Sequence, residues 1–188
     1  IIAIILIFAL LLGTTACGQP PADTTMPSTP GAVGTTGTQG AKTVKILCDA
    51  LGIWCIIAIS EANPEKGIKY RHAWNILKPD GEYFHLDATF DNSLGHDGII
   101  RYDYFNLDDA RLFRDHEPVI YPIPACSCND RFYYRENKLS FTKIEDVCKR
   151  AQMPIRKDLP FVFHLRGGYL TRDVLKELVT ALDETAQT

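Results

Sequence analysis

The stretch YRHAWNILKPDGEYFHLDATF, residues 70–90, constrains the fold more than any other part of the chain. Two runs with strand-like residues, 70–78 and 82–90, flank the tripeptide Pro79-Asp80-Gly81. Pro, Asp and Gly are the residues that tight turns prefer, because they fix or permit the unusual backbone angles of a turn. The pattern therefore predicts an antiparallel β-hairpin.

The hairpin brings a histidine and an aspartate together. A two-residue loop at Pro79 and Asp80 places His72 opposite Asp87 and Trp74 opposite His85. Directly opposed residues share a face of the sheet, with Cβ atoms about 4.5–5.5 Å apart. A bulge at the turn moves His72 and Asp87 to a diagonal that is still within reach. A histidine beside a carboxylate supplies two of the three members of a nucleophilic triad.

Length and composition limit the fold and the partners. The chain has 188 residues, of which 46% are hydrophobic, which suits one domain or one domain with appendages. Its 20 basic and 23 acidic residues give a net charge of −3. This balance provides no polycationic surface, so we expect no nucleic-acid partner.

The first segment predicts export. Residues 1–12 are all apolar. As a helix they span only about 18 Å, too short for a hydrocarbon core of about 30 Å, but typical of a signal peptide. The small residues ending in Ala16-Cys17 resemble a bacterial lipoprotein cleavage site, with Cys17 lipidated and anchored at a membrane surface. An ordinary secretory signal, giving a secreted protein, is the alternative.

A tether is expected next. Residues 18–40 are dominated by Gly, Pro, Thr and Ser and have almost nothing to bury, so they are predicted to be disordered.

The rest of the chain predicts an α+β fold with an antiparallel middle. A helix over 41–51 has Val44, Leu47, Cys48 and Leu51 on one face and ends at Gly52. We expect a strand at 53–60, a short helix from Asp108, an extended run at 116–125 and a strand at 161–165. A helix is expected at 143–152, opened by a Thr142 capping box and closed before Pro154. A last helix is expected at 172–185, capped by Thr171, with Val174, Leu175, Leu178 and Leu182 buried.

The residues HAWNILKPDGEYFHLDATFDN and YDYFNLDDARLFRDHEP resemble the bacterial transglutaminase-like superfamily of papain-like cysteine enzymes. The resemblance implies a core at 41–125 with a helix packed on an antiparallel sheet, incomplete at its N-terminal side, and a C-terminal α/β extension at 126–188. It implies that His72 is the general base and that Asp87 orients it. The activity it implies is thiol-dependent acyl transfer or hydrolysis on amide bonds of peptide, protein or cell-wall substrates, without a cofactor.

The nucleophile that this resemblance requires is missing. It belongs at the N-terminus of the helix, where the helix dipole lowers a thiol pKa. Gly37 or Thr38 stands there, and neither is cysteine. Cys48 and Cys55 are predicted to be buried, inert thiols. We therefore expect a catalytically defective member of the family, a pseudoenzyme.

The sequence is also compatible with two other functions. The domain could serve as a non-catalytic surface binding module. Alternatively, His72, His85 and Asp87 could hold a metal in a metal-assisted hydrolase, since two histidines and a carboxylate suit zinc. With Cys17 lipidated, five cysteines remain, an odd number. The sequence leaves two alternatives open: a disulfide that joins Cys148 to Cys126 or Cys128, or cysteines that remain unpaired.

Overall fold

A computed structural model describes residues 35–66, 71–117 and 119–187. The chain forms two compact units that divide between Arg131 and Phe132, and each is described by itself. The predicted signal, the lipidation site Cys17 and residues 18–34 of the predicted tether lie outside the described residues.

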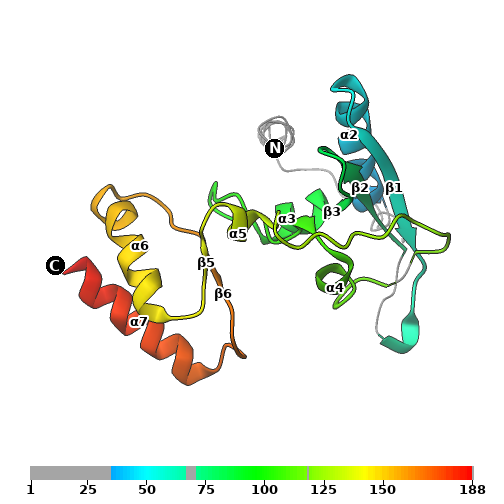
Figure 1. Cartoon of the computed structure of the whole chain (residues 1–188). Coiled ribbons are helices and arrows are strands. Elements are labelled where there is room, and N and C mark those ends of the chain that lie inside the picture. The colour runs from blue at the N-terminus through cyan, green and yellow to red at the C-terminus, as the bar shows by residue number, and fades with distance from the viewer. Residues whose placement is uncertain (1–34, 67–70, 118, 188) are drawn as a thin grey trace, which may run out of the picture. The chain divides into compact units, whose positions relative to one another are not determined.

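The first unit is built on a four-stranded antiparallel sheet (Figure 1). Its strands follow the chain order, so each strand pairs with the next one in the sequence. Mixed helix and antiparallel sheet confirm the predicted α+β class. The strands are β1 (Trp54–Ser60), β2 (His72–Lys78), β3 (Phe84–Leu86) and β4 (Phe105–Leu107), with a short helix η1 (Pro64–Lys66) between the first two.

Helix α2 (Thr35–Ala50) packs on β1 and β2. Val44 and Cys48 on its inner face are fully buried, as the periodicity predicts, whereas Leu51 is exposed. The helix ends as expected at Gly52, whose φ of 68° is accessible to glycine at little cost. Its start differs from the prediction, because residues 35–40, assigned above to the tether, are helical.

The hairpin is present, but its second strand is shorter than predicted. The expected strand over 82–90 stops at Leu86, and helix α3 (Ala88–Leu94) follows directly. The cause is Asp87, whose side chain accepts hydrogen bonds from the backbone N–H groups of Thr89 and Phe90 and so caps the helix.

The predicted register is also wrong. Ile76, not Trp74, stands opposite His85, and Leu77 pairs with Phe84. The paired strands leave a turn longer than two residues, in which Gly81 takes a φ of 91°. A longer turn shifts every pairing along the hairpin, because loop length sets register.

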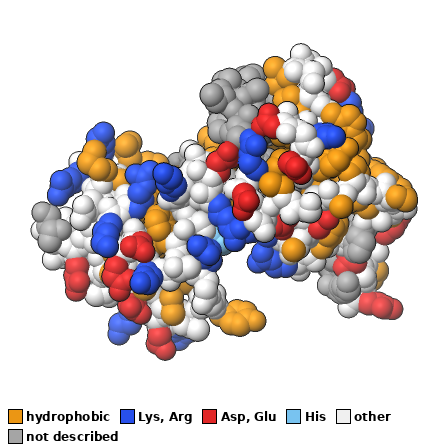
Figure 2. Space-filling model, in the orientation of Figure 1, with side chains coloured by type: hydrophobic (Ala, Val, Ile, Leu, Met, Phe, Trp, Pro, Cys, Tyr) orange, Lys and Arg blue, Asp and Glu red, His pale blue; other side chains and the backbone are white. Residues whose placement is uncertain are grey.

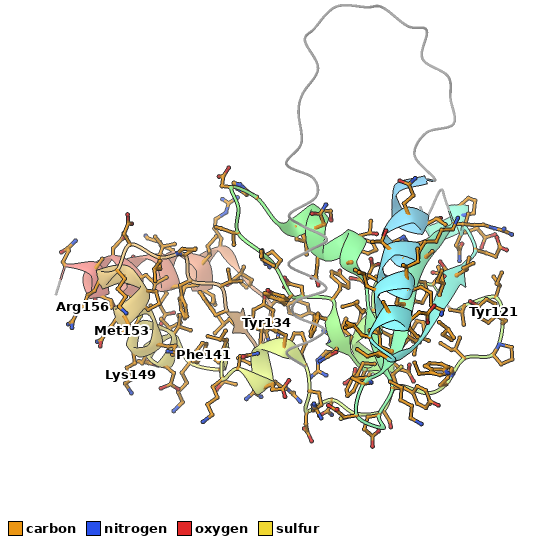
Figure 3. The ribbon with its side chains drawn as sticks, turned by 90° about the horizontal axis from the view of Figure 1, so that it is seen from above. Tyr121, Tyr134, Phe141, Lys149, Met153 and Arg156 are labelled. Carbon is orange, nitrogen blue, oxygen red and sulfur yellow. The ribbon has the colours of Figure 1, made fainter. Side chains whose placement is uncertain are left out.

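The chain after β4 behaves as predicted. Helix α4 (Asp109–Leu112) is capped by Asp108, which accepts from the Arg111 N–H at 2.7 Å. The proline-rich run then follows the outer edge of β1: Val119 bridges to Ser60, and the Ile120 N–H donates to the Ile59 carbonyl at 3.1 Å. Tyr121, labelled in Figure 3, donates its hydroxyl to a carbonyl of the same strand. This run covers an edge that would otherwise be open.

The second unit contains a two-stranded parallel sheet and two longer helices (Figure 1). Figure 3 marks Tyr134 and Phe141 near its start, and Lys149, Met153 and Arg156 along α6. Helices α6 and α7 pack on each other. The elements are α5 (Tyr133–Glu136), β5 (Ser140–Phe141), α6 (Ile144–Arg156), β6 (His164–Leu165) and α7 (Arg172–Ala186).

Three details of this unit differ from the prediction. The capping box at Thr142 is absent: Lys143 precedes α6 and makes no side-chain cap. The helix does not close before Pro154 but includes it in its last turn, where a missing N–H costs only one bond. Of the four residues expected to be buried on α7, only Leu178 is, and Leu175 is exposed. Thr171 caps α7 as predicted.

The surface carries both signs of charge. On the face shown in Figure 2, Lys and Arg side chains alternate with Asp and Glu and form no single basic patch. Among the described residues, no helix combines the length and apolar character needed to cross a lipid bilayer.

Candidate functional site

Asp87 is the centre of a buried polar cluster at the junction of β3 and α3. Its side chain is 1% exposed, and its Oδ1 accepts the N–H groups of Thr89 at 2.9 Å and Phe90 at 3.1 Å. Its Oδ2 accepts from the Nε2 atoms of His72 and His116. Burial by itself would raise the pKa of Asp87, but the bonds from His116 and His72 hold that pKa below its ordinary value. Asp87 is therefore an anion.

His72 begins β2 and is the partly exposed member of the cluster. Its Nε2–H donates to Asp87 Oδ2, and its side chain is 22% exposed. The ring stacks on Trp74, with centroids 5.9 Å apart, and meets Phe90 edge-to-face at 4.8 Å. Together with the bond to Asp87, these ring contacts fix the plane of the imidazole. The predicted proximity of His72 and Asp87 is confirmed.

The pair meets despite the wrong register. Asn75 is opposite Leu86, and extending this pairing by one residue puts Trp74 opposite Asp87. His72 is then the diagonal neighbour of Asp87 on the same face, and a long side chain spans that diagonal.

His116 is the third member, and the sequence reasoning missed it. It follows α4 and is 1% exposed at its side chain. Its Nε2 lies 3.0 Å from Asp87 Oδ2 and its Nδ1 lies 2.7 Å from Asp115 Oδ1. Burial by itself would lower the pKa of His116, yet the hydrogen bonds to Asp87 and Asp115 raise it. A carboxylate at each nitrogen favours the imidazolium form of the ring.

No periodic pattern points to His116. It lies on a non-repetitive segment far along the chain from the hairpin, and only the return of that segment after α4 brings it to Asp87. The adjacent Asp115-His116 pair is the sole local signal. Tyr104 extends the cluster outward, because its hydroxyl donates to Asp115 Oδ2 at 2.5 Å.

His85 does not belong to this cluster, which corrects the predicted metal triad of His72, His85 and Asp87. The ring of His85 is fully buried, and Trp74 Nε1–H donates to its Nδ1 at 3.0 Å. Its Nε2 faces Asp109 Oδ1 at 2.8 Å. Burial lowers the pKa of His85, and the bond to Asp109 opposes this only in part.

The tautomer of His85 excludes it as a metal ligand. Because the indole N–H is only a donor, Nδ1 must be unprotonated, and the single proton of the neutral ring sits on Nε2. The donor atoms of His85, Asp109 and Cys126 lie within 4.8 Å of one another, but a metal there would require an imidazolate. We interpret this group as a structural link between β3 and the start of α4.

The cluster can hold and orient a base. His72 uses Nε2 for Asp87, which leaves Nδ1 as the nitrogen that can take a proton from a nucleophile. For nucleophilic catalysis, such a base must have a nucleophile within hydrogen-bond reach. Within the described part of the chain, no thiol is hydrogen-bonded to His72.

Two thiols lie beneath α2, where the sequence predicted buried cysteines. Cys48 is 0% and Cys55 is 5% exposed, and their thiols hydrogen-bond to each other. That bond and burial raise the pKa of Cys48. The pKa of Cys55 is lowered by the bond from Cys48, although burial opposes this, and Asn75 Nδ2 adds a contact at 3.4 Å. The described cysteines, Cys48, Cys55, Cys126, Cys128 and Cys148, are all free thiols.

We expect alkylation to separate these thiols by burial. At pH 8, iodoacetamide should label Cys128 and Cys148 first, because they are partly exposed, and Cys48 and Cys126 slowest. Burial raises the pKa of Cys126 to about 12, which suppresses its thiolate. Peptide mass spectrometry at several times gives each rate. Labelling of Cys55 ahead of Cys128 at pH 6 would contradict its inert role and make it a candidate nucleophile.

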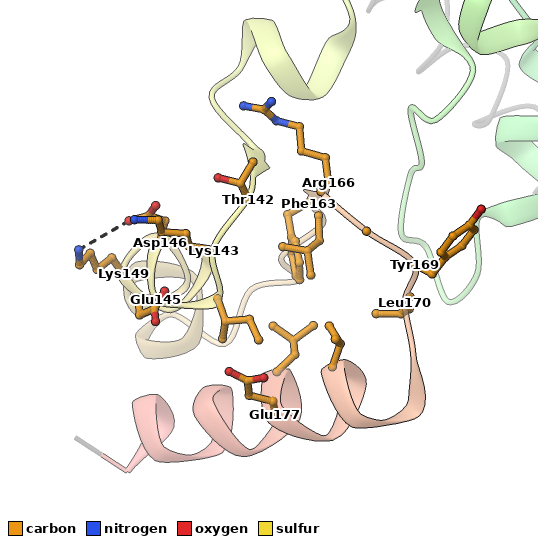
Figure 4. A pocket seen from close by; sticks show the side chains of 16 residues that line it. Thr142, Lys143, Glu145, Asp146, Lys149, Phe163, Arg166, Tyr169, Leu170 and Glu177 are labelled. Carbon is orange, nitrogen blue, oxygen red and sulfur yellow. Dashed lines mark ion pairs between the residues drawn. The ribbon is translucent and has the colours of Figure 1, made fainter.

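The second unit has its own groove, of about 930 Å³. Figure 4 shows the start of α6 on one side, Glu177 of α7 on another, and the segment from Arg166 to Leu170 at the rim. Tyr169 is 94% exposed. The groove contains apolar and charged side chains of both signs, without a cluster of catalytic groups.

No family model matches the chain, and the search of curated proteins found no match.

Proposed function

We propose that the first unit is a transglutaminase-like, papain-like core, in which His72 is the general base and Asp87 orients it. The observation that carries the proposal is the bond from His72 Nε2–H to the buried, anionic Asp87. This pair matches two of the three members of a cysteine triad, the base and its carboxylate, and leaves Nδ1 for a thiol. The reaction class is thiol-dependent acyl transfer or hydrolysis on peptide, protein or cell-wall amides.

The position of α2 supports the proposal. Gly40, in the first half of this helix, is so close to α3 that a Cβ on it would lie 2.7 Å from Thr89 Oγ1. Thr89 in turn donates its N–H to Asp87. The start of α2 is thus near the carboxylate, and a thiol there would benefit from the helix dipole.

This chain has no cysteine at that position, and we propose that it is inactive. We also propose that the protein is exported and held at a membrane surface through a lipid on Cys17. A non-catalytic surface module is the second candidate, favoured by Thr38 at the nucleophile's place. Retention of the chain on isolated cell-wall material, unchanged by His72→Ala, would favour that candidate.

Restoring the nucleophile tests the proposal. Successive helix residues point about 100° apart, so both Thr38→Cys and Gly37→Cys are needed. We expect one of them to hydrolyse an activated aryl ester with a burst of acyl-enzyme, and His72→Ala in that background to lower the rate about 100-fold or more. Stopped-flow absorbance measures both.

Thr38→Ser is the matched control, because it changes the helix start without adding a thiol. If neither cysteine variant exceeds this control, the proposed arrangement is wrong. If a variant is active but indifferent to His72→Ala, the thiol reacts without the base, which contradicts the assigned role of His72.

A further inference from the structure

Three donor atoms converge at the buried cluster. His72 Nε2, Asp87 Oδ2 and His116 Nε2 all lie within 4.8 Å of one another. His116 Nε2 is 3.0 Å from Asp87 Oδ2. Ligands 2.0–2.2 Å from a tetrahedral zinc are separated by roughly 3.3–3.6 Å. A small outward movement of the two rings would therefore open a zinc-sized position between the three atoms.

The remaining donor and acceptor atoms of His116 and Asp87 are already committed in the way that metal ligands require. His116 donates its Nδ1–H to Asp115 at 2.7 Å, which leaves Nε2 as its donor atom. This is the carboxylate–histidine–metal arrangement of many zinc sites. Asp87 Oδ1 is held by the N–H groups of Thr89 and Phe90, which leaves Oδ2. His85, by contrast, fails this test.

The surroundings suit an open site. Aromatic rings contact the cluster: Phe90 lies 4.7 Å and Trp74 5.1 Å from the ring centroid of His116. Such a shell limits water at the ligands. His72 alone is partly exposed, so a fourth position on its side is open to water. Three protein ligands and one open position are typical of catalytic zinc.

We propose that His72, Asp87 and His116 form a zinc-binding site. The proposal does not rest on the thiol chemistry above, because it uses His116 and needs no cysteine. Binding displaces the Nε2 proton of His116 to solvent, whereas the His72 ring keeps one proton, now on Nδ1. The metal takes the place of the Nε2 protons between the two rings and Asp87. Since zinc and the triad use the same nitrogen of His72, zinc should inhibit an active Thr38→Cys variant.

Isothermal titration of the purified full chain with Zn²⁺ tests this. We expect one zinc per chain with micromolar or tighter affinity, and about one proton released, from His116, read from the heat in two buffers of different ionisation enthalpy. His116→Ala should weaken binding at least 100-fold. Asp115→Asn, which removes the negative charge behind His116, should weaken zinc binding about 10–100-fold.

His96→Ala is the matched control. His96 is exposed and pairs with Asp97, so its loss should leave zinc affinity unchanged. If His116→Ala fails to fold by circular dichroism, Asp115→Asn decides the question, because the Asp115 side chain is 51% exposed. Unchanged affinity in folded variants, or no binding to the parent chain, overturns the proposal.

Cobalt substitution identifies the ligands independently. A site of two nitrogens and one oxygen gives d–d absorption without a thiolate charge-transfer band. A charge-transfer band that survives His116→Ala would place the metal on cysteines and refute the site. Ester hydrolysis by Thr38→Cys in metal-free buffer is independent of this result, so the two proposals fail separately.

Discussion

Replacing Asp87 with alanine is expected to destabilise the first unit by about 3–5 kcal/mol. The change removes the buried one of the two carboxylates that His116 contacts, and breaking a buried ion pair costs that much. It also removes the cap of α3, worth about 1 kcal/mol, and the expected total of about 3–5 kcal/mol includes this loss. At about 4–8 °C per kcal/mol, thermal denaturation followed by circular dichroism should show a melting temperature at least about 10 °C lower.

Two variants separate the charge from the cap. Asp87→Asn retains an oxygen for the α3 amides but presents N–H groups to two histidines, so it should keep most of the loss. Asp108→Ala is the matched cap control, because Asp108 is also a buried cap but contacts Arg111 instead of histidines. If Asp87→Ala and Asp108→Ala lowered the melting temperature equally, the histidine cluster would contribute no more than the ion pair that Asp108 forms with Arg111.

The stability of the first unit should fall as pH rises above about 6.5. His116 has a raised pKa in the folded chain, so it retains its proton at a pH where the unfolded chain, with an ordinary histidine pKa of about 6.5, has lost it. Its contribution is complete below about pH 6.5 and is lost as pH rises through the folded pKa. The slope is at most about 1.4 kcal/mol per pH unit for one proton. Urea unfolding between pH 6.5 and 8 measures it, and His116→Gln should flatten it.

Other titrating groups of the unit also change its stability with pH, and their contributions must be separated from that of His116. His85 has a lowered pKa in the folded chain, so its contribution to the stability of the unit is lost as pH falls below about 6.5. That loss lies outside the range of pH 6.5 to 8 in which His116 is measured. Burial raises the pKa of Asp91 well above its usual value, which adds a slope of the same sign as that of His116. The Asp91→Asn variant removes it. A slope abolished by Asp91→Asn and unaffected by His116→Gln would show that His116 is not the titrating group.

Local chemistry predicted much of the site. A short turn joins two strands, so the closeness of His72 and Asp87 survives an error of register. Asp87 was predicted as a strand residue, yet its side chain caps α3, a role that the run Asp-Ala-Thr-Phe indicates only weakly. The register itself depends on the length of the turn, and Pro79-Asp80-Gly81 fits turns of more than one length.

The sequence alone could not show which histidine belongs to the proposed metal site. His85 stands two residues from Asp87, and the sequence offers it as an alternative metal ligand, because alternate strand residues share a face. Only the position of the Trp74 indole, which fixes the proton on His85 Nε2, removes it. This contact depends on packing between neighbouring strands.

The sequence by itself determined the α+β class, the helix over residues 41–50, the strands of the hairpin and the pairing of His72 with Asp87, because periodicity and turn residues act over short distances. Only the tertiary structure decided that His116 completes the cluster. The segment after α4 has no periodicity that would orient a side chain, and its path is set by its bonds to the edge of β1. Long-range contacts of that kind place His116 beside Asp87, and no local pattern encodes them.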